Sequence, residues 1–184
     1  MVKVEIIKGK DLSKKYKHLI AKENINNFDC CKTLEKELES QKDDLNSFWF
    51  FIKDRNKIVS FGLLKPVKIK YLGKIYNIFG IGNIISIEKG KSYGTILIKE
   101  IMAYVKKRNK TALAFTGSKV SRFYRKCGLE IEPKLKDRFF YDYGDSKTNK
   151  AEKGWWGVYI EGRDKFISKV LKTKSIVQIP CEHW

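Results

Sequence analysis

The stretch 75–108 reads IYNIFGIGNIISI (75–87), EKGKSYGT (88–95) and ILIKEIMAYVKKR (96–108), and the rest of the chain is organised around it. The first segment is uncharged, rich in Ile, and too short to span a bilayer, so it predicts a fully buried strand. The last segment predicts an amphipathic helix because its apolar residues recur at helical spacing. That apolar face comprises Ile96, Leu97, Ile101 and Val105.

The turn between the strand and the helix predicts an anion site. Gly90 and Gly94 allow a close bend, so several backbone N–H groups can point outward from the helix N-terminus. Thr95 is expected to cap the helix, and Lys89 and Lys91 add positive charge beside the bend. A phosphate-bearing ligand would suit such a turn.

Two common phosphate-binding patterns fit this turn poorly. Gly90-Lys91-Ser92 spells the GKS of a P-loop, but Ile85 stands where that motif requires its first glycine. Gly80-Ile81-Gly82 resembles the start of a dinucleotide fingerprint, but Ile85 again occupies a glycine position and no helix follows directly.

Composition predicts one globular domain over 1–184, with 161–184 as a C-terminal extension. The formal net charge of +18 comes from 39 basic and 21 acidic residues, but only six of the basic residues are Arg. Because the lysines are spread along the chain, they indicate a generally basic surface that favours anionic ligands rather than a nucleic-acid footprint. The charged segment 1–10 does not resemble a signal peptide, and no apolar run reaches membrane-spanning length. The cysteines form no C-x-x-C pair, which favours a reducing, cytoplasmic location; they are Cys30, Cys31, Cys127 and Cys181.

The order of predicted elements favours a mixed α/β fold with a mostly antiparallel central sheet flanked by helices. Strands are expected at 2–7, 48–53, 57–71, 75–87, 111–116 and 175–180, and as a pair at 139–143 and 155–160. Helices are expected at 13–24, 31–41, 95–108, 120–127 and 164–172. Pro66 predicts a bulge or an edge position, and Asn26-Asn27 a helix end.

The turn and a second motif together resemble the GNAT acetyltransferase superfamily, over roughly 48–129. That superfamily carries R/Q-x-x-G-x-G/A after its fourth strand, where this chain has Lys89-Gly90-Lys91-Ser92-Tyr93-Gly94. Gly94 matches the last glycine of the motif. Lys89 occupies the position of its Arg or Gln, and Ser92 that of its first glycine. The second motif, F-Y-x-x-x-G-hydrophobic, is matched by residues 123–129. The segment 71–83 is similar to the aminoglycoside 2′-N-acetyltransferase branch.

The resemblance implies an acetyl-CoA-dependent N-acetyltransferase, in which an acceptor amine attacks the thioester directly. The pyrophosphate would bind the N–H groups of 91–95, and the pantetheine arm would pair with the splayed strand at 84–87. Tyr124 would be the catalytic proton donor to the thiolate. Ser118 would replace a contact of the family's Asn, because Gly117 stands at that position. The implied cofactor-binding residues are Ile84, Ile85, Ser86, Ile87, Lys89, Gly90, Lys91, Ser92, Tyr93, Gly94, Thr95, Ser118 and Arg122, with Lys119 adding charge.

Other features of the site stay open in the sequence. No Asp or Glu occurs between Arg55 and Ile87, and Glu88 is expected to face solvent, so the sequence identifies no general base. A water chain is one candidate for that role. The acceptor is a small-molecule or peptide amine, and a lid at 144–154 and a homodimer are left open. The aromatic residues Trp155, Trp156, Tyr141 and Phe139 form either a wall of the acceptor pocket or a buried strand pair. Neither His18 nor the adjacent Cys181-Glu182-His183 supplies a closed metal site, so no metal is expected.

One alternative function comes from the charge alone. The same fold would then be a non-catalytic basic module that binds RNA or another polyanion. It is distinguished from the enzyme by salt-sensitive binding to nucleic acid without binding of coenzyme A.

Overall fold

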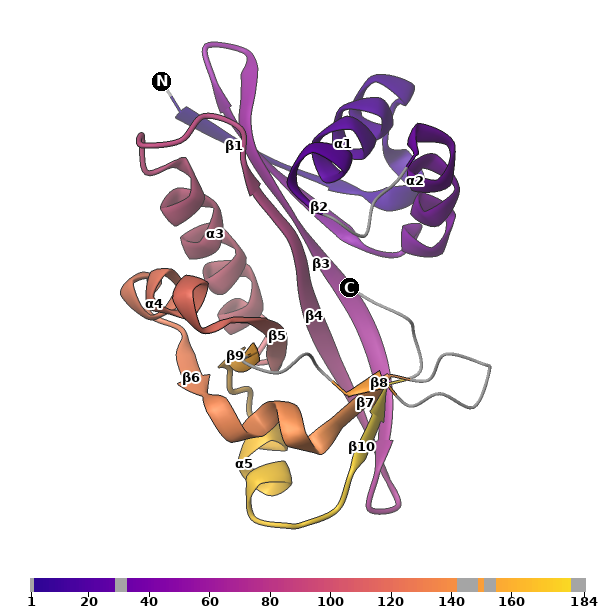
Figure 1. Ribbon diagram of the computed structural model, residues 1–184, viewed down its shortest axis with the longest axis vertical. Coiled ribbons are helices and arrows are strands. Elements are labelled where there is room, and N and C mark those ends of the chain that lie inside the picture. The colour runs from indigo at the N-terminus through magenta and orange to yellow at the C-terminus, as the bar shows by residue number, and fades with distance from the viewer. Residues whose placement is uncertain (1, 29–32, 142–148, 151–154, 180–184) are drawn as a thin grey trace. The chain divides into compact units, whose positions relative to one another are not determined.

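A computed structural model describes residues 2–28, 33–141, 149–150 and 155–179 (Figure 1). The strands are β1 (Val2–Lys8), β2 (Phe48–Asp54), β3 (Lys57–Tyr71), β4 (Lys74–Ser86), β5 (Ala112–Gly117), β6 (Glu130–Glu132), β7 (Phe139–Tyr141), β8 (Asn149–Lys150), β9 (Trp155–Ile160) and β10 (Val177–Ile179). The helices are α1 (Lys14–Asn27), α2 (Leu34–Ser40), α3 (Tyr93–Lys107), α4 (Ser118–Cys127) and α5 (Phe166–Leu171). None of the described helices has the length and apolar character needed to cross a bilayer.

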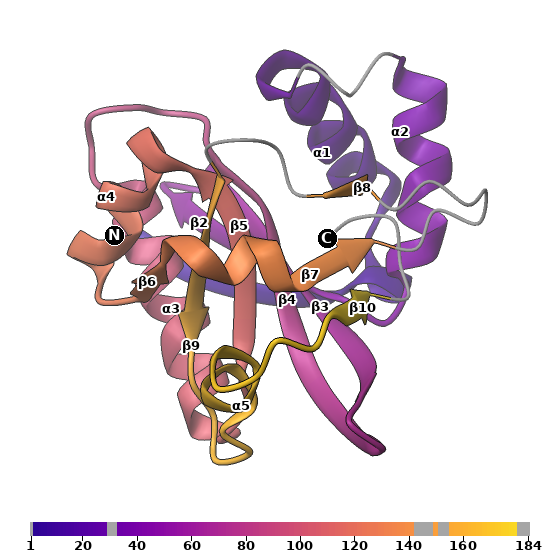
Figure 2. The same ribbon diagram turned by 60° about the horizontal axis from the view of Figure 1, so that its bottom comes forward.

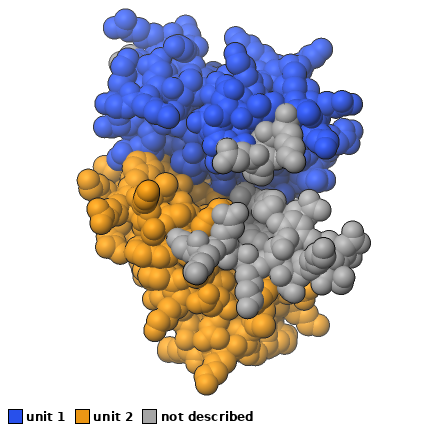
Figure 3. All heavy atoms as spheres, in the orientation of Figure 1, with its two compact units in different colours: residues 1–65, 82–97 blue, residues 66–81, 98–184 orange. Residues whose placement is uncertain are grey.

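Seven strands form one sheet in the order β1-β2-β3-β4-β5-β9-β6, and three form a second sheet in the order β10-β7-β8. The large sheet is mostly antiparallel, whereas β4 and β5 form a short parallel ladder at Phe79 and Gly80. This mixed, mostly antiparallel α/β architecture confirms the predicted fold class. The chain divides into two compact units, residues 1–65 with 82–97 and residues 66–81 with 98–184 (Figure 3).

The first unit is built on the β2–β3 hairpin. Its turn residues Arg55 and Asn56 both have positive φ, at 47° and 69°, as a tight hairpin turn requires. One face of the sheet in this unit packs against α1 through a buried cluster, which comprises Leu12, Ile20, Trp49, Phe51, Phe61, Leu63 and Ile85. Helices α1 and α2 lie side by side (Figures 1 and 2) and are joined by the Asn24 amide, which donates to Glu37 at 2.9 Å.

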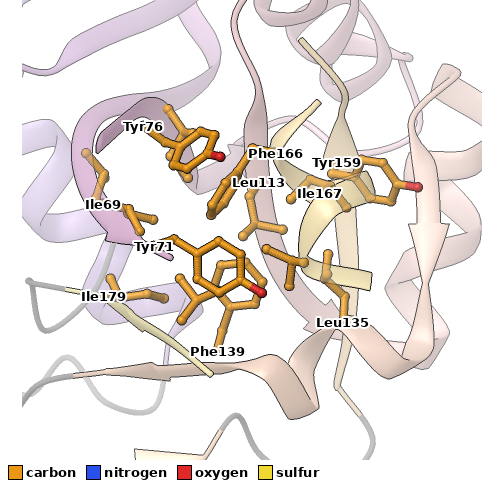
Figure 4. Close-up of a cluster of buried hydrophobic side chains, with 14 residues drawn as sticks. Ile69, Tyr71, Tyr76, Leu113, Leu135, Phe139, Tyr159, Phe166, Ile167 and Ile179 are labelled. Carbon is orange, nitrogen blue, oxygen red and sulfur yellow. The ribbon is translucent and has the colours of Figure 1, made fainter. Parts of the chain in front are cut away.

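The second unit has its own core around α5. Phe166 packs edge-on against Tyr71 and Phe139, with ring centroids 5.9 and 6.2 Å apart (Figure 4). The small sheet closes this core, because Phe139 of β7 and Ile179 of β10 are fully buried. The Tyr71 hydroxyl is hydrogen-bonded to Thr173 just after α5.

Several strand predictions were wrong in detail. The segments 139–141 and 155–160 do not pair; β7 pairs with β8 and β10, whereas β9 pairs with β5 and β6. Their aromatic composition and closeness in sequence favour a strand pair, but each segment instead pairs with strands from elsewhere in the chain. The edge strand β6 was missed because its three residues are too few for a period.

Other boundaries moved for local reasons. β3 runs unbroken through the exposed Pro66, which lies past Leu64, the last residue that pairs with β2. β4 is not buried throughout, because Ile75 is 58% exposed near the hairpin tip. α1 includes Asn26-Asn27 rather than ending there. Outside the described residues lie Cys30, Cys31, Cys181, His183 and 142–148 with 151–154 of the loop.

Candidate functional site

The turn before α3 has the backbone shape of an anion site. α3 begins at Tyr93, so Thr95 lies inside the first helical turn and is not the cap that was expected. Gly90 and Ser92 both have left-handed backbones, with φ of +81° and +60°. Within the described part of the chain, the N–H groups of 91–95 donate no hydrogen bond, and the first helical bond runs from Ile96 N–H to Ser92 O at 3.1 Å. These donors at a helix N-terminus suit a phosphate group.

Ser92 stands where the superfamily motif has its first glycine, and its backbone conformation shows why glycine is usual at that position. A left-handed φ costs a non-glycine residue about 1–2 kcal/mol, and a glycine almost nothing. The serine nevertheless holds φ of +60°, so the bend is maintained by the structure around it.

Neighbouring strands hold the turn in place. The Tyr93 hydroxyl donates to Asp54 Oδ2 at 2.7 Å, linking the start of α3 to the β2–β3 hairpin. The N–H groups of Ile87 and Glu88 both donate to Val59 O, at 2.9 and 3.3 Å. The Tyr93–Asp54 bond could not be predicted from the sequence, because the two residues are 39 positions apart.

Glu88 was expected to face solvent, but in the structure its carboxylate forms two ion pairs. Its carboxylate contacts Lys57 Nζ at 2.8 Å and Lys91 Nζ at 3.1 Å. The hydrogen bonds from Lys57 and then Lys91 lower the pKa of Glu88, so it stays ionised. Lys91, one of the two cations predicted beside the bend, is therefore partly neutralised before any ligand binds.

Replacing Glu88 with Gln should strengthen binding of an anionic ligand at the turn. Lys57 and Lys91 would then be free to face the ligand, and the gain should be roughly two- to five-fold, as for other exposed charge pairs. Calorimetric titration with coenzyme A at low and high salt measures this effect, which should shrink as salt rises. Glu39→Gln, which breaks the exposed Lys42–Glu39 pair on α2, is the matched control. A weaker affinity for Glu88→Gln would contradict the placement of the ligand.

β4 changes direction where the pantetheine arm is expected. Asn83 has φ of +49°, and the ladder with β5 covers only Phe79 and Gly80. Past that point Ile85 O accepts from the buried Ser60 hydroxyl at 2.8 Å, which fixes this residue toward β3. The Ser86 hydroxyl donates a hydrogen bond to Glu88 O at 3.0 Å. Ile84 and Ser86 are half-buried, so this end of β4 is only partly covered.

The second motif lies on α4, in the second unit. Gly117 precedes the helix, and Gly128 ends it with φ of +98° as the expected left-handed residue. Its N–H bonds Arg125 O at 2.9 Å and the next N–H bonds Tyr124 O at 3.2 Å. Ser118 is the first helical residue, and its carbonyl accepts a hydrogen bond from Ser121 Oγ at 2.7 Å. The side chains of Ser118, Lys119 and Arg122 are exposed.

Tyr124 lies on the buried face of α4 and is 7% exposed. Its ring packs edge-on against Phe123, with centroids 5.3 Å apart. Burial, with a smaller contribution from Cys127, raises the pKa of Tyr124 to about 12. The hydroxyl therefore keeps its proton at any physiological pH, and among the described residues it makes no hydrogen bond that would compete with a ligand.

Stability should fall with alkaline pH because of Tyr124. Its pKa is about 12 in the folded protein and 10 as the ordinary value, so below pH 10 it is protonated in both states. Between these values the unfolded chain ionises first, and the free energy of unfolding falls by about 2–3 kcal/mol as pH rises. Burial also raises the pKa of Tyr159, so both residues contribute. Urea unfolding at pH 9 and pH 11 should show a smaller loss for Tyr124→Phe; an equal loss would contradict the assignment.

The predicted site residues are thus divided between the two units. The residues of 84–95 belong to the first unit, whereas Ser118, Arg122 and Tyr124 belong to the second. Phe139 is fully buried in the core of the second unit and cannot line an acceptor pocket, while Trp155 and Trp156 are half-buried on β9. Within the described ranges, no group of three His, Cys, Asp or Glu side chains is placed to hold a metal ion.

This chain is similar to known proteins in structure but not detectably in sequence. No family model matches the chain, and no curated protein matches it. An acyl-CoA N-acyltransferase from Pseudomonas aeruginosa has a TM-score of 0.59 at 12% identity, over 86% of this chain and 99% of that one. The N-acetyltransferase PseH of Campylobacter jejuni, in complex with acetyl coenzyme A, has a TM-score of 0.51 at 15% identity, over 88% and 99%.

A longer chain also matches. A conserved protein of unknown function from Enterococcus faecalis V583 has a TM-score of 0.58 at 20% identity, over 71% of this chain and 32% of that one. At these identities the likeness establishes the fold, and the chain has the fold of the GNAT N-acetyltransferases.

Proposed function

We propose that this protein is an acetyl-CoA-dependent N-acetyltransferase. The observation that carries the proposal is the turn at 88–95, where Gly90 and Ser92 have left-handed backbones. The N–H groups of 91–95, at the start of α3, donate no hydrogen bond to any described residue. This arrangement suits the pyrophosphate of coenzyme A. The acetyl coenzyme A complex of PseH, which shares the fold, supports the same cofactor.

In this proposal the chain's residues have distinct roles. The amides of 91–95 bind the pyrophosphate, Lys89, Lys91 and the exposed Arg122 supply positive charge, and the backbone of 84–87 receives the pantetheine arm. An acceptor amine attacks the thioester carbonyl, the C–S bond breaks, and Tyr124 donates its hydrogen bond to the departing thiolate. The amine's proton leaves to water.

The acceptor is proposed to be a primary amine of a small molecule or a peptide. The strongly basic composition, with a formal net charge of +18, disfavours a polycationic acceptor and is compatible with a neutral or acidic one. A cytoplasmic location is part of the proposal, because the four cysteines of the sequence are scattered and form no C-x-x-C pair.

Calorimetry and an acetyl-transfer screen test this function together. Coenzyme A should bind saturably, and acetyl-CoA should release free thiol only when a suitable amine from a panel of amines, amino acids and peptides is present. Lack of coenzyme A binding at millimolar concentration would refute the proposal. Binding without transfer to any amine would leave the cofactor site standing and refute the activity.

A further inference from the structure

The outer edge of β1 carries an exposed apolar strip. β1 is the first strand of the large sheet, so in the described part of the chain its outer edge has no partner strand (Figure 1). Val2, Val4 and Ile6 lie on one face of β1 and are 39%, 37% and 45% exposed. The intervening Glu5 and Ile7 face the other side, where Glu5 contacts Tyr16 and Ile7 joins the core. Such an edge is a template for pairing with another strand.

The hydrogen-bond pattern shows which backbone groups of β1 point outward. β1 and β2 are antiparallel, with Lys8 opposite Phe48, and Gly9 N–H donates to Ser47 O at 2.9 Å at the end of the ladder. Bonded pairs alternate in such a ladder, so Lys3, Glu5 and Ile7 direct their N–H and C=O groups toward β2. The even-numbered residues direct theirs to the free edge.

We infer that β1 pairs antiparallel with β1 of a second copy of this chain, centred on Val4. In this register Val4 is opposite the same residue of the partner, and Val2 is opposite Ile6. All the outward backbone groups then face one another, and the three apolar side chains form one strip across the two-fold axis. On the other face Lys3 is opposite Glu5 of the second copy, which is an attractive pair.

The neighbouring registers are disfavoured by charge. Registers centred on Lys3 or on Glu5 also align the outward backbone groups, but they place Lys opposite Lys or Glu opposite Glu at the axis. Within its own chain Glu5 is held ionised by Lys53 at 2.5 Å, and hydrogen bonds from Lys53 and Tyr16 lower its pKa. Lys3 lies opposite Lys53 across the β1–β2 ladder, so a second carboxylate relieves that repulsion.

The association should be weak and should strengthen with salt. A single strand pair buries less surface than a typical stable interface. Each copy also carries a formal net charge of +18, and the mutual repulsion is screened as salt rises. This salt response is opposite to that of nucleic-acid binding, which weakens with salt.

Sedimentation velocity at protein concentrations up to about 1 mM, in low and high salt, tests the pairing. Dimer should be present and should increase with salt. Val4→Pro removes an N–H that points away from β2, and Lys3→Glu places like charges opposite each other, so both should shift the protein to monomer. Lys10→Glu makes the same charge change beyond the paired residues and should keep the dimer. A monomer under all conditions, or a dimer that survives both Val4→Pro and Lys3→Glu, would overturn the inference.

Cysteine cross-linking tests the register itself. In the proposed register Val4→Cys places two sulfur-bearing residues opposite each other, at a Cα separation of about 5.5 Å that a disulfide can bridge. Val2→Cys places them four residues apart along the strand, about 13 Å, which is too far. Oxidation should cross-link Val4→Cys more than Val2→Cys in the same background; equal yields would exclude this register.

Discussion

Tyr124→Phe should lower turnover by about 100-fold while leaving the affinity for coenzyme A unchanged. The pKa of Tyr124 is raised to about 12, well above about 8.5 for a typical thiol, so full proton transfer to the thiolate is uphill. The hydroxyl therefore acts by donating a hydrogen bond to the charge that develops on sulfur, and this bond exists only late in the reaction. A loss in kcat without a change in cofactor affinity is the expected pattern.

The matched control for this variant is Tyr76→Phe. Tyr76 is 8% exposed, belongs to the same unit and loses the same hydroxyl, but it packs in the core beside Phe166. Steady-state rates and coenzyme A calorimetry on both variants separate a role in the reaction from a role in packing. If Tyr124→Phe keeps the turnover of the unsubstituted protein, Tyr124 is a packing residue only.

Ser92→Val should weaken coenzyme A binding by at least about tenfold, whereas Ser92→Gly should keep or improve it. Ser92 has φ of +60°, and a β-branched side chain in that region is a severe outlier, so the bend must move and its amides lose their common direction. Glycine adopts the same backbone without strain. The comparison therefore tests the shape of the bend without removing any charge.

Ser13→Val controls for the chemical change itself. Ser13 precedes α1 with φ of −67° and makes no side-chain capping bond, so valine fits there without backbone strain. Calorimetric affinities and urea unfolding should show that Ser13→Val leaves both values nearly unchanged. Coenzyme A binding to Ser92→Val with the original affinity would mean that the bend does not hold the cofactor.

The sequence predicted the elements whose determinants are local. The break between the strands expected at 48–53 and 57–71, the end of the helix expected at 120–127 and the strand–turn–helix of 75–108 all follow from neighbouring residues, and the structure confirms each of them. The cap at Thr95 was misplaced because positive φ at Ser92 lets α3 begin two residues earlier.

Strand pairings and contacts between residues far apart in the chain could not be predicted from the sequence. Pairing of β9 with β5 and β6, and the small sheet of β7, depend on strands that periodicity cannot match to each other. In the candidate site, the positions of the turn and of Tyr124 were predicted by motif spacing. The Glu88 ion pairs and the Tyr93–Asp54 bond were not, because each joins residues more than 30 positions apart or depends on side-chain direction.

The high pKa of Tyr124 makes the pH profile informative about the unknown acceptor. Since this hydroxyl stays protonated up to about pH 12, it adds no titration step of its own to the pH dependence of the rate near neutral pH. The rise in rate with pH would then track loss of the proton from the acceptor amine. An α-amine titrates near pH 8 and a lysine side chain near pH 10.4. The pH of half-maximal rate, even with an unpurified acceptor, would therefore distinguish N-terminal from lysine acceptors.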